Sequence, residues 1–258
     1  MIPAHDPPGH GLLAGRVAVV TAAAGTGIGG ATARRLALEG ASVVLSDVHE
    51  RRLDEAVEAL APDVPGQVHG VVCDVSRPEA FEELFDEVAS LVGLPDVVVN
   101  NAGLGGSAPL HEMTDEQWRT VMDVSLWSVF RSTRSALRRM GPRGSGTIVN
   151  VASVTGWRAE SGQAHYAAAK AGVMALTRCA AVEAAPHGVR VVAVAPTLAR
   201  HPFLERVVPA AELDAWAAVQ PHGRAAEPGE VASVIAALAS GYASYVTGEV
   251  VSVGALHA

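Results

Sequence analysis

Lysine is almost absent from this chain. Lys170 is the only lysine among 258 residues, and arginine carries the remaining basic charge. Cysteine is also scarce: Cys73 and Cys179 lie far apart and have no metal-ligand spacing. We therefore expect neither a disulfide framework nor a metal site, and we expect a reducing compartment.

The chain also lacks an excess of basic residues and a long apolar run. Its formal net charge is −8, which argues against a nucleic-acid partner, because such a partner calls for a basic face. No apolar run is long enough to span a membrane, so no membrane partner is expected. Residues 1–11 are rich in Pro, Gly and His and lack the regions of a signal peptide. We expect a flexible N-terminal tail there and a cytoplasmic protein.

Short apolar runs alternate with longer segments of helical period along the chain. The runs are near-continuous, as in parallel strands that are covered on both faces. They span residues 17–21, 42–46, 68–73, 96–100, 147–151, 189–195 and 249–253. This pattern predicts one α/β domain over 12–258, a three-layer, doubly wound (Rossmann) parallel sheet of about seven strands with helices on both faces.

Local signals mark where the helices begin and end. Capping boxes are predicted at Ser76 with Glu79 and at Thr114 with Gln117. Helix stops are predicted at Gly40, Gly93 and Gly188. The stretch from about 197 to 224 breaks the β-α rhythm directly after a strand, so we interpret it as a lid over a ligand site.

The lone lysine follows Tyr166 by four residues, a spacing that stacks two side chains on one helix face. An ammonium near a phenol favours the phenolate, so we expect Lys170 to lower the pKa of Tyr166 towards neutral. Arginine would hold the charge, but its planar fork does not replace a compact ammonium. The Tyr-x-x-x-Lys spacing also arises by chance, so this pair alone does not identify a function.

A glycine-rich loop follows the first predicted strand and precedes a helix. Such a loop lets backbone N–H groups and the helix dipole meet a pyrophosphate. The predicted cofactor residues in it are Gly25, Thr26, Gly27, Ile28 and Gly29. Asp47 ends the second predicted strand, where a carboxylate accepts both ribose hydroxyls and repels a 2′-phosphate. NAD is therefore the predicted cofactor, with NADP as the alternative because Arg51 and Arg52 are close in sequence.

Together these segments resemble the short-chain dehydrogenase/reductase family in its compact single-domain form. The family markers occur in order: the glycine loop, Asp47, residues 73–75, residues 100–103, Ser153, Tyr166 with Lys170, and Pro196. The match runs from about residue 12 to the C-terminus. The resemblance implies an NAD(P)-dependent oxidoreductase that interconverts a secondary alcohol and a ketone by hydride transfer.

The resemblance also implies roles for individual residues. Tyr166 would exchange the proton on the substrate oxygen, and Lys170 would lower the pKa of Tyr166 and bind the nicotinamide ribose. Ser153 would position the reacting oxygen, and Ser125 stands at the fourth catalytic position. Further cofactor contacts are implied for Asp74, Val75, Asn101, Ala102, Gly103 and Pro196, together with Tyr166 and Lys170.

Several positions depart from the family pattern. Position 125 is Asn in the family, where it helps to hold a water that relays protons to the lysine, and Ser125 reaches less far. The glycine loop is one residue longer and begins with alanines, so Gly25 is a candidate for the missing glycine. Thr197 stands where a glycine usually follows Pro196, and Gly254 interrupts the usual Val-Asp-Gly-Gly near the C-terminus.

Several strings resemble one branch, the bacterial dehydrogenases of steroid C/D-ring degradation. Among them are Gly-Trp-Arg-Ala, Ala-Arg-His and Gly-Arg-Ala-Ala-Glu-Pro. The branch implies a bulky ring-bearing acyl-CoA as substrate. The alternatives are a 3-oxoacyl-thioester reductase acting on acyl carrier protein or CoA substrates, and a nucleotide-binding homologue with weak catalysis. An epimerase or dehydratase on sugar nucleotides would need a larger substrate domain.

Candidate substrate residues flank the predicted site. Trp157 would form an apolar wall, and Arg158, Arg200 and His201 would lie near the mouth. His201 is equally suited to contact a substrate or cofactor phosphate and to pack within the lid.

Three arginines, Arg131, Arg134 and Arg138, form a stripe at helical spacing. The stripe would be solvated, face another subunit, or receive CoA phosphates. The amphipathic segments around 114–140 and 163–185 resemble the dimer-forming helix pair of the family, so a homotetramer is expected.

Overall fold

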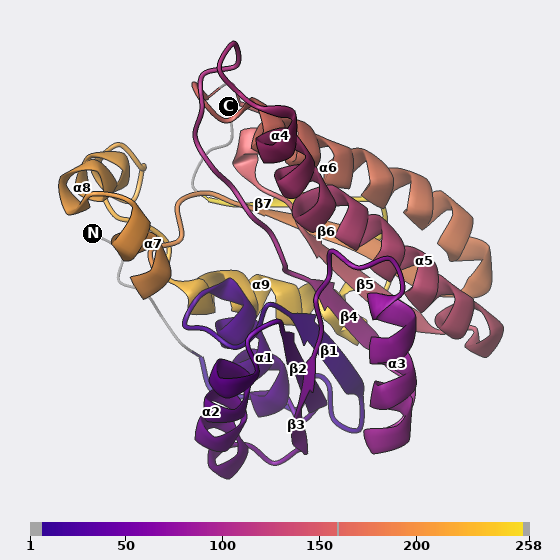
Figure 1. Ribbon diagram of the computed structural model, residues 1–258. Helices are drawn as coiled ribbons and strands as arrows, with labels where there is room; N and C mark the ends of the chain where they lie inside the picture. The colour runs from indigo at the N-terminus through magenta and orange to yellow at the C-terminus, as the bar shows by residue number, and fades with distance from the viewer. Residues whose placement is uncertain (1–6, 159, 255–258) are drawn as a thin grey trace.

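The structure, a computed structural model, describes residues 7–158 and 160–254. Within these residues the chain forms one parallel sheet of seven strands (Figure 1). They are β1 (Val17–Thr21), β2 (Ser42–Asp47), β3 (Val68–Val72), β4 (Val97–Asn100), β5 (Gly146–Val151), β6 (Val189–Pro196) and β7 (Val250–Val253). The predicted strands and the doubly wound fold are confirmed, and no strand end differs from its prediction by more than about one residue.

Helices connect the strands. The α-helices are α1 (Ile28–Leu38), α2 (Glu50–Leu60), α3 (Ala80–Leu91), α4 (Asp115–Met122), α5 (Ser128–Met140), α6 (Ala164–Ala184), α7 (Pro202–Val207), α8 (Ala210–Ala218) and α9 (Pro228–Ala239). A π-helical turn, Asp123–Trp127, joins α4 to α5. Short 3-10 turns lie at Ala61–Asp63, Gly141–Arg143, Val154–Gly156, Ala185–His187 and Gly241–Ala243.

The strand order sets the point at which ligands are expected to bind in a sheet of this kind. The order is β3-β2-β1-β4-β5-β6-β7. The strands from β1 to β3 are added towards one edge of the sheet and those from β4 to β7 towards the other, so the order reverses between β1 and β4. Parallel pairing of β1 with β2 on one side and with β4 on the other places the carboxyl ends of all three strands at one edge. A crevice outside these ends, at the point of reversal, is the expected ligand site.

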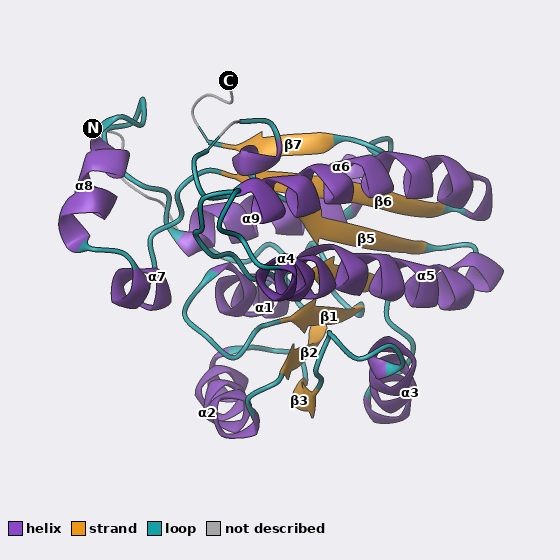
Figure 2. Cartoon of the chain, turned by 45° about the horizontal axis from the view of Figure 1, so that its top comes forward, coloured by secondary structure: helices purple, strands orange, loops and turns teal. Residues whose placement is uncertain are grey.

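Helices cover both faces of the sheet (Figure 2). Val20 and Val43 belong to a core cluster that includes residues of α1, α2 and α9. The neighbouring residues Val19 and Val44 belong to a second cluster with α3, α5 and α6. Successive strand residues point to opposite faces, so near-continuous apolar strands are required where both faces are covered.

Most of the predicted helix ends are present. The Thr114 and Gln117 capping box forms at the start of α4. The Ser76 and Glu79 box is wrong: α3 begins after Glu79 without a side-chain cap, and Ser76 instead donates to Asp74. The contact between Ser76 and Asp74 replaces the predicted cap, because an Asp side chain readily accepts hydrogen bonds from the residue two positions later in the chain.

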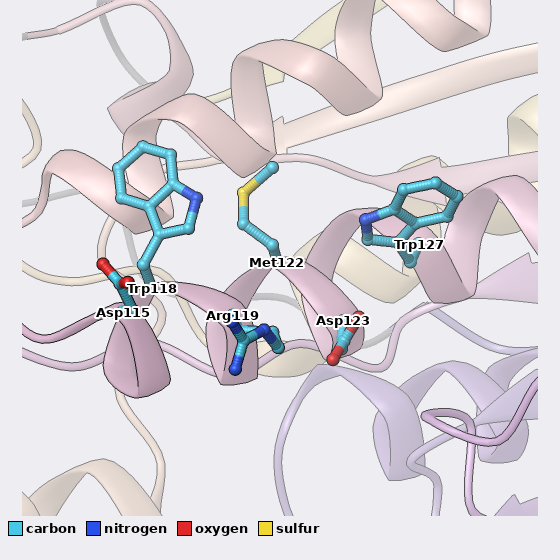
Figure 3. Close-up of a pocket in the computed structure, with 6 residues that line it drawn as sticks. All are labelled: Asp115, Trp118, Arg119, Met122, Asp123 and Trp127. Atoms are coloured by element: carbon cyan, nitrogen blue, oxygen red, sulfur yellow. The ribbon is translucent and has the colours of Figure 1, made fainter.

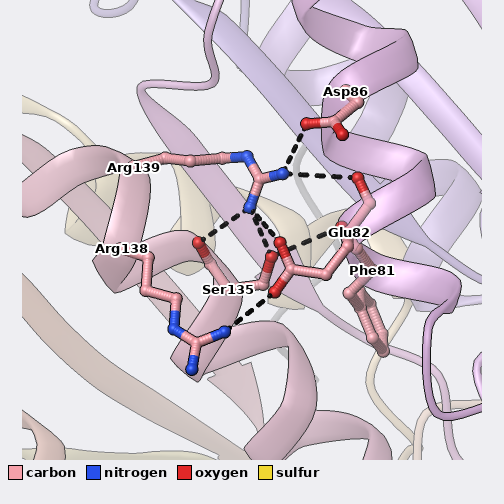
Figure 4. Close-up of polar contacts among 6 residues, drawn as sticks. All are labelled: Phe81, Glu82, Asp86, Ser135, Arg138 and Arg139. Atoms are coloured by element: carbon pink, nitrogen blue, oxygen red, sulfur yellow. Dashed lines mark hydrogen bonds and ion pairs between the residues drawn. The ribbon is translucent and has the colours of Figure 1, made fainter.

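Arginines of α5 bind the acidic side of α3 (Figure 4). Arg139 donates to Glu82 at 2.6 Å and also contacts Asp86, while Arg138 lies 3.4 Å from Glu82. Arg131 donates to the carbonyl oxygen of Ser76 at 2.8 Å. Two of the three residues in the predicted arginine stripe therefore join α5 to the neighbouring helix α3 and the loop before it.

The predicted lid contains two short helices, α7 and α8, that project beyond the sheet (Figure 1). Its two stems meet where Ala199 pairs with Ala226 in a parallel bridge. Arg200 pairs with Glu205 of α7 at 2.8 Å and with Asp214 of α8 at 2.6 Å. This arginine therefore joins the two lid helices.

The described part of the N-terminal segment is held against α1 rather than loose. Arg35 donates to the carbonyl oxygens of Pro7 and Pro8 and pairs with Glu39. Glu39 also accepts from the backbone of His10 and Leu12, at 2.9 and 3.1 Å. Residues 1–6 of the predicted tail lie outside the described residues.

Glu39 is ionised in this setting. Burial raises its pKa, but the backbone N–H groups of Leu12 and His10 and the Arg35 guanidinium outweigh burial, and the net pKa lies below its ordinary value. A lowered folded-state pKa means that the contribution to stability is present above the unfolded pKa. It is lost as the pH falls through the folded pKa.

Within residues 7–158 and 160–254, no helix combines the length and apolar character that a membrane crossing requires. The same residues contain no cluster of three or more His, Cys, Asp and Glu side chains arranged to hold a metal ion.

Arg35→Met should lower the free energy of unfolding by about 3 kcal/mol, because it leaves a buried carboxylate without its cation. The matched control is Arg51→Met. Arg51 makes the same i,i+4 pair with Glu55, but its side chain is 82% exposed against 6% for Arg35. The control should cost about 0.5 kcal/mol or less. Urea denaturation followed by circular dichroism measures both, and equal losses would contradict the buried-pair interpretation.

Candidate active site

The loop after β1 begins with a backbone turn that glycine usually makes. Ala22 has φ of +52°, the sole positive value found outside glycine in the part of the chain that the structure describes. This left-handed conformation costs roughly 1 kcal/mol for a residue with a Cβ. Ala22, rather than Gly25, therefore has the left-handed backbone that glycine favours, and the role expected for Gly25 stays a prediction. Gly25 has no positive φ and no atom within 4 Å of a Cβ built there.

Two later glycines let the loop and α1 pack closely. A Cβ on Gly29 would lie 2.2 Å from the carbonyl oxygen of Ala22, and one on Gly30 would lie 1.8 Å from that of Gly25. Neither distance is possible for real atoms, so both positions need glycine. Thr26 is exposed, and Ile28 packs at the edge of the first core cluster.

The N-terminus of α1 fits a pyrophosphate. Gly27 is the N-cap residue and supplies no side-chain cap, so the first-turn N–H groups are not satisfied in the usual way. Such N–H groups and the helix dipole favour an anion. Together with the close-packed glycines, this arrangement fits the predicted dinucleotide.

Asp47 lies at the end of β2, beside the same loop. Its Oδ2 accepts from the backbone of Ala24 at 3.3 Å, and its Oδ1 accepts from that of His49 at 3.1 Å. Arg52 approaches Asp47 to 4.0 Å, while Arg51 pairs with Glu55. The carboxylate is thus fixed at the position predicted for ribose binding, with one arginine nearby.

Asp74 and Val75 follow β3, the next strand outward. Asp74 accepts from the backbone and hydroxyl of Ser76 at 2.9 and 2.7 Å. Val75 packs at the edge of the second core cluster. Their neighbour Cys73 donates its N–H to the carbonyl oxygen of Asp47 at 3.0 Å, which ties this turn to the end of β2.

The 101–103 turn after β4 braces the cofactor loop. The Asn101 amide donates to the carbonyl oxygens of Thr21 and Ala22 at 3.0 and 3.2 Å. The backbone N–H groups of Asn101 and Ala102 both donate to the Thr21 hydroxyl at 3.0 Å. Sequence reasoning overlooked Thr21, although its place at the end of an apolar strand could have marked it. Gly103 lies close to Lys170, since a Cβ there would be 3.2 Å from Nζ.

Helix α6 places Tyr166 and Lys170 on the same side. The Lys170 amine lies 5.6 Å from the centre of the Tyr166 ring. Lys170 is 2% exposed, and its amine donates to the carbonyl oxygen of Val151, at the end of β5, at 2.6 Å. The predicted pairing on one helix face is therefore present, and it points to the carboxyl edge of the sheet.

The expected lowering of the Tyr166 pKa is not found. Burial raises the pKa of Tyr166, a hydrogen bond with Ser153 lowers it, and the charge of Glu160 raises it, with a net upward shift. Burial also lowers the pKa of Lys170 to about 8. The amine donates to the Val151 carbonyl oxygen, and burial is the largest cause of the pKa shift of both groups.

Ser153 lies between the end of β5 and the 3-10 turn that precedes α6. Its hydroxyl accepts from the Thr155 backbone and donates to the Thr155 hydroxyl, both at 3.2 Å. Thr155 in turn donates to Glu160 at 3.5 Å. Ser153 also forms a side-chain hydrogen bond with Tyr166, and Lys170 lies 5.6 Å from the Tyr166 ring, so the structure brings these three predicted residues together.

Ser125 lies on the π-helical turn between α4 and α5 and is fully buried. Its hydroxyl donates to the carbonyl oxygen of Leu104 at 2.9 Å and accepts from the Leu104 N–H at 2.8 Å. The serine therefore holds the loop that follows the 101–103 turn. The turn carries π geometry, which is frequent at functional sites.

That loop separates Tyr166 from a neighbouring hollow. A Cβ on Gly105 would lie 3.7 Å from the Tyr166 ring, and one on Gly106 would lie 3.3 Å from Nε2 of His165. The hollow has a volume of about 290 Å³ and is lined by the loop, by α4 and by His165. The loop therefore lies between the hollow and the predicted catalytic tyrosine.

Two departures from the family pattern, Thr197 and Gly254, lie next to each other near Pro196 and depend on each other. Pro196 ends β6 and lies opposite Val253 of β7. Thr197 follows, and its N–H donates to the Val253 carbonyl oxygen at 3.1 Å. A Cβ on Gly254 would lie 2.2 Å from Cγ2 of Thr197. The threonine thus fills the space that a side chain at position 254 would need.

The candidate substrate residues lie around this edge. Trp157 is 39% exposed and follows the turn at Gly156, which packs on α6 beside Lys170 and Ala171. Arg158 is half-buried, and its N–H donates to the carbonyl oxygen of Val154 at 3.1 Å. His201 begins α7 and lies against Gly27 of the cofactor loop. Arg200 is held by its lid ion pairs.

Known proteins match this chain over nearly its whole length. A family model described as enoyl-(acyl carrier protein) reductase matches residues 22–255. A (5R,7aS)-5-hydroxy-7a-methyl-1-oxo-2,3,5,6,7,7a-hexahydro-1H-indene-carboxyl-CoA reductase of Mycobacterium tuberculosis is 60% identical, over 96% of this chain and 95% of that protein. A cis-4-hydroxycyclohexanecarboxylate dehydrogenase of Sinomonas cyclohexanicum is 46% identical over 93% of this chain and 96% of its own.

Further matches include a reductase and a solved structure. A 3-oxoacyl-[acyl-carrier-protein] reductase of Thermotoga maritima is 40% identical over 93% of this chain and 97% of its own. A crystal structure of a short chain dehydrogenase from Mycobacterium smegmatis superposes with a TM-score of 0.88. That protein is 53% identical, with 99% of this chain and 98% of the other covered.

The chain belongs to the short-chain dehydrogenase/reductase family. It is accordingly an NAD(P)-dependent oxidoreductase that acts on CH–OH groups and interconverts a secondary alcohol and a ketone.

Proposed function

We propose that this protein oxidises a ring-bearing secondary alcohol, or reduces the matching ketone, with NAD as cofactor and a CoA thioester as substrate. The observation that carries the proposal is the buried Lys170 amine, 5.6 Å from the Tyr166 ring and close to Gly103 in the turn after β4. A tyrosine can exchange a proton with a substrate oxygen, and Ser153 would bind the same oxygen.

Each proposed catalytic residue has a separate role in the reaction. In oxidation Tyr166 acts as the phenolate and becomes a neutral phenol when it accepts the hydroxyl proton of the substrate; in reduction the neutral phenol gives its proton to the carbonyl oxygen and becomes the phenolate. Ser153 donates a hydrogen bond that orients this oxygen, and Lys170 supplies positive charge as the phenol ionises. The dinucleotide, when bound, accepts or supplies the hydride. Gly27, Ile28 and Gly29 would hold its pyrophosphate at the start of α1.

The ring-bearing substrate is supported by two relatives and by the exposed side chains near the site. One relative is named for a hydroxy-oxo-hydroindene-carboxyl-CoA, and another for a hydroxycyclohexanecarboxylate. Leu104, Leu110 and Trp157 are large apolar residues that are 40%, 68% and 39% exposed. They lie on the loops after β4 and β5, and such surface suits an apolar ring system. Arg158 and His201 remain candidate contacts for the thioester portion.

A second candidate is reduction of a 3-oxoacyl thioester. The observation that favours it is the 40% identity to a 3-oxoacyl-[acyl-carrier-protein] reductase. Both reactions use the same tyrosine chemistry, so the substrate pocket, rather than the catalytic group, distinguishes them.

NAD is proposed over NADP because of Asp47. Its carboxylate would accept hydrogen bonds from two ribose hydroxyls and would repel a 2′-phosphate. Arg52, 4.0 Å from this carboxylate, is the residue that could favour NADP if the negative charge were removed. Asp74, Val75, Asn101, Ala102, Gly103 and Pro196 complete the proposed cofactor surroundings.

A homotetramer is part of the proposal. Trp118, Met122 and Trp127 lie along one side of α4 and the π turn, beside a surface hollow of about 240 Å³ (Figure 3). Trp118 and Trp127 are 39% and 49% exposed, and Val182 of α6 is 76% exposed. Burying such surfaces between copies would remove apolar area from water. Analytical ultracentrifugation should give four chains per particle, and a monomer at micromolar concentration would contradict this.

The proposed compartment is the cytoplasm. Cys73 and Cys179 are both free thiols, Cys73 buried and Cys179 exposed, as a reducing compartment allows. Cell fractionation that recovered the protein outside the cytoplasm would contradict this assignment.

Tyr166→Phe should reduce the turnover of a cyclic secondary alcohol with NAD by about 10²- to 10⁴-fold, because the proton acceptor is lost. The matched control is Tyr245→Phe, which removes the same hydroxyl from a fully exposed tyrosine and should leave turnover unchanged. Absorbance of NADH at a series of alcohol and hydroxyacyl-CoA concentrations measures the rate. A Tyr166→Phe variant with most of its turnover would overthrow the mechanism. Dinucleotide binding by the wild type without turnover of any substrate in the panel would favour the weak-catalysis alternative.

Asp47→Asn should raise the preference for NADP over NAD by about 10- to 100-fold, because it removes one charge and keeps the shape of the side chain. Glu50→Gln is the matched control, since Glu50 is an exposed acid in the first turn of α2. Dissociation constants for NAD and NADP from calorimetric titration check both variants. An unchanged preference in Asp47→Asn would show that position 47 does not select the cofactor.

A further inference from the structure

A series of hydrogen-bonded side chains leads from Tyr166 towards the protein surface. Ser153 forms a side-chain hydrogen bond with Tyr166. The Ser153 hydroxyl donates to the Thr155 hydroxyl at 3.2 Å, and the Thr155 hydroxyl donates to Oε2 of Glu160 at 3.5 Å. Thr155 is 8% exposed, whereas Glu160 is an exposed residue. The series therefore connects the phenol to a carboxylate that water can reach.

The backbone of one short segment holds these groups in place. Ser153 begins the 3-10 turn Val154–Gly156, and its Oγ accepts from the Thr155 N–H at 3.2 Å. At the other end of the segment, the carbonyl oxygen of Glu160 accepts from the N–H of Gln163, the N-cap residue of α6. The two hydroxyls and the carboxylate are thus anchored beside the start of the helix that carries Tyr166.

The hydroxyl protons in the series all point the same way. Ser153 directs its one proton to Thr155, so its oxygen can accept from the Tyr166 phenol. Thr155 directs its own proton to Glu160. If each proton moves across its hydrogen bond, Tyr166 loses a proton, Glu160 gains one, and both hydroxyls between them remain complete.

The hydroxyl of Ser125 is engaged elsewhere. It donates its one proton to the carbonyl oxygen of Leu104 at 2.9 Å and accepts from the Leu104 N–H at 2.8 Å. A hydroxyl that binds the backbone with both its donor and an acceptor is poorly suited to pass a proton on. The occupied bonds of Ser125 therefore favour the Ser153 series as the path of a proton.

We propose that Thr155 and Glu160 form a proton relay that connects Tyr166 to solvent through Ser153. The inference rests on the proposed function, because it requires Tyr166 to exchange a proton with a substrate. In oxidation, the phenol that has taken the substrate proton passes a proton to Ser153, Ser153 to Thr155, and Thr155 to the Glu160 carboxylate, which releases it to water. Tyr166 is then a phenolate again, and in reduction every step runs in reverse. The electron pair leaves as the hydride of the proposed reaction, so the relay moves protons alone.

The charge of Glu160 suits the end of such a relay. Burial is the largest cause of the raised pKa of Tyr166, and the negative charge of Glu160 also raises it. When Glu160 takes a proton, this opposing charge disappears as the phenolate forms. The single proton of Ser153 can be directed to the substrate oxygen or to Thr155, so orientation of the substrate and proton transfer alternate at one hydroxyl.

Three substitutions test the relay. Thr155→Val removes the hydroxyl but keeps the size of the side chain, the N–H that binds Ser153 and the charge of Glu160. Thr155→Ser keeps a hydroxyl at this position. Glu160→Gln keeps the shape of the side chain but cannot take up a proton. Glu183→Gln is the matched control, since Glu183 is an exposed acid near the far end of α6.

Stopped-flow absorbance of NADH measures single turnovers of a cyclic secondary alcohol with NAD and an excess of the full-length protein. Product release does not limit such a turnover. Because the pKa of Tyr166 is raised, most molecules start as the phenol and must lose a proton first. Thr155→Val and Glu160→Gln should be slower than the wild type by about 10-fold or more. Thr155→Ser should stay within about 3-fold of the wild type, and Glu183→Gln should be unchanged.

Added formate supplies a readout that a structural role would not affect. At constant ionic strength, formate should bring Glu160→Gln to within about 3-fold of the wild type, because a free carboxylate can take the proton from Thr155. Formate should not restore Thr155→Val, which lacks the hydroxyl that passes the proton on.

The outcomes separate the relay from the proposed function. If Tyr166→Phe is inactive while Thr155→Val and Glu160→Gln react as the wild type does, the relay is overturned and the proposed function stands. A slow Glu160→Gln that formate does not restore, or a Thr155→Ser as slow as Thr155→Val, would show that these residues only support the turn, which also overturns the relay. A Tyr166→Phe variant that keeps its turnover would overturn the proposed mechanism and the relay together.

Discussion

The amide group of Asn101 holds the site together at the point where the sheet reverses its order. It donates to the carbonyl oxygens of Thr21 and Ala22, the last residue of β1 and the first of the cofactor loop. This contact joins the ends of β1 and β4, the two strands between which the strand order reverses. It also occupies the space above Gly29, where a Cβ would lie 2.4 Å from the Asn101 amide nitrogen. The end of β1, the cofactor loop and the start of α1 are thereby held in one arrangement.

The Lys170 side chain is constrained in a comparable way at the end of β5. An ammonium that is 2% exposed is costly unless it is hydrogen-bonded, and here the Val151 carbonyl oxygen accepts from it. Desolvation favours the neutral forms of both Lys170 and Tyr166, since it lowers the pKa of the first and raises that of the second. A charge that appears on the phenol during proton transfer would then be stabilised by a nearby ammonium that water screens weakly. The pair is suited to a transient charge rather than a permanent one.

The sequence predicted the fold and the proximity of Tyr166 and Lys170 on one helix better than the details of the loops. Apolar strands covered on both faces leave a strong pattern, and the i,i+4 spacing of Tyr166 and Lys170 is fixed by helix geometry. The Ser76 box failed because Asp74 offers that serine a nearer partner. The conformation of Ala22 could not be predicted, because a left-handed alanine contradicts its local preference, and the contact of its carbonyl oxygen with the Asn101 amide comes from a residue far along the chain. The direction in which the Tyr166 pKa is shifted also could not be predicted, because it depends on burial of the side chain, and sequence spacing carries no information about burial.

The departures from the family pattern bear on whether catalysis is retained. Ser125 is shorter than the asparagine usual at its position, yet it makes both an accepting and a donating bond to the backbone of Leu104. Thr197 adds a side chain where glycine is usual, and Gly254 removes one at the place where the two would collide. Each altered residue thus fits its neighbours, so none of these departures breaks the packing around the site.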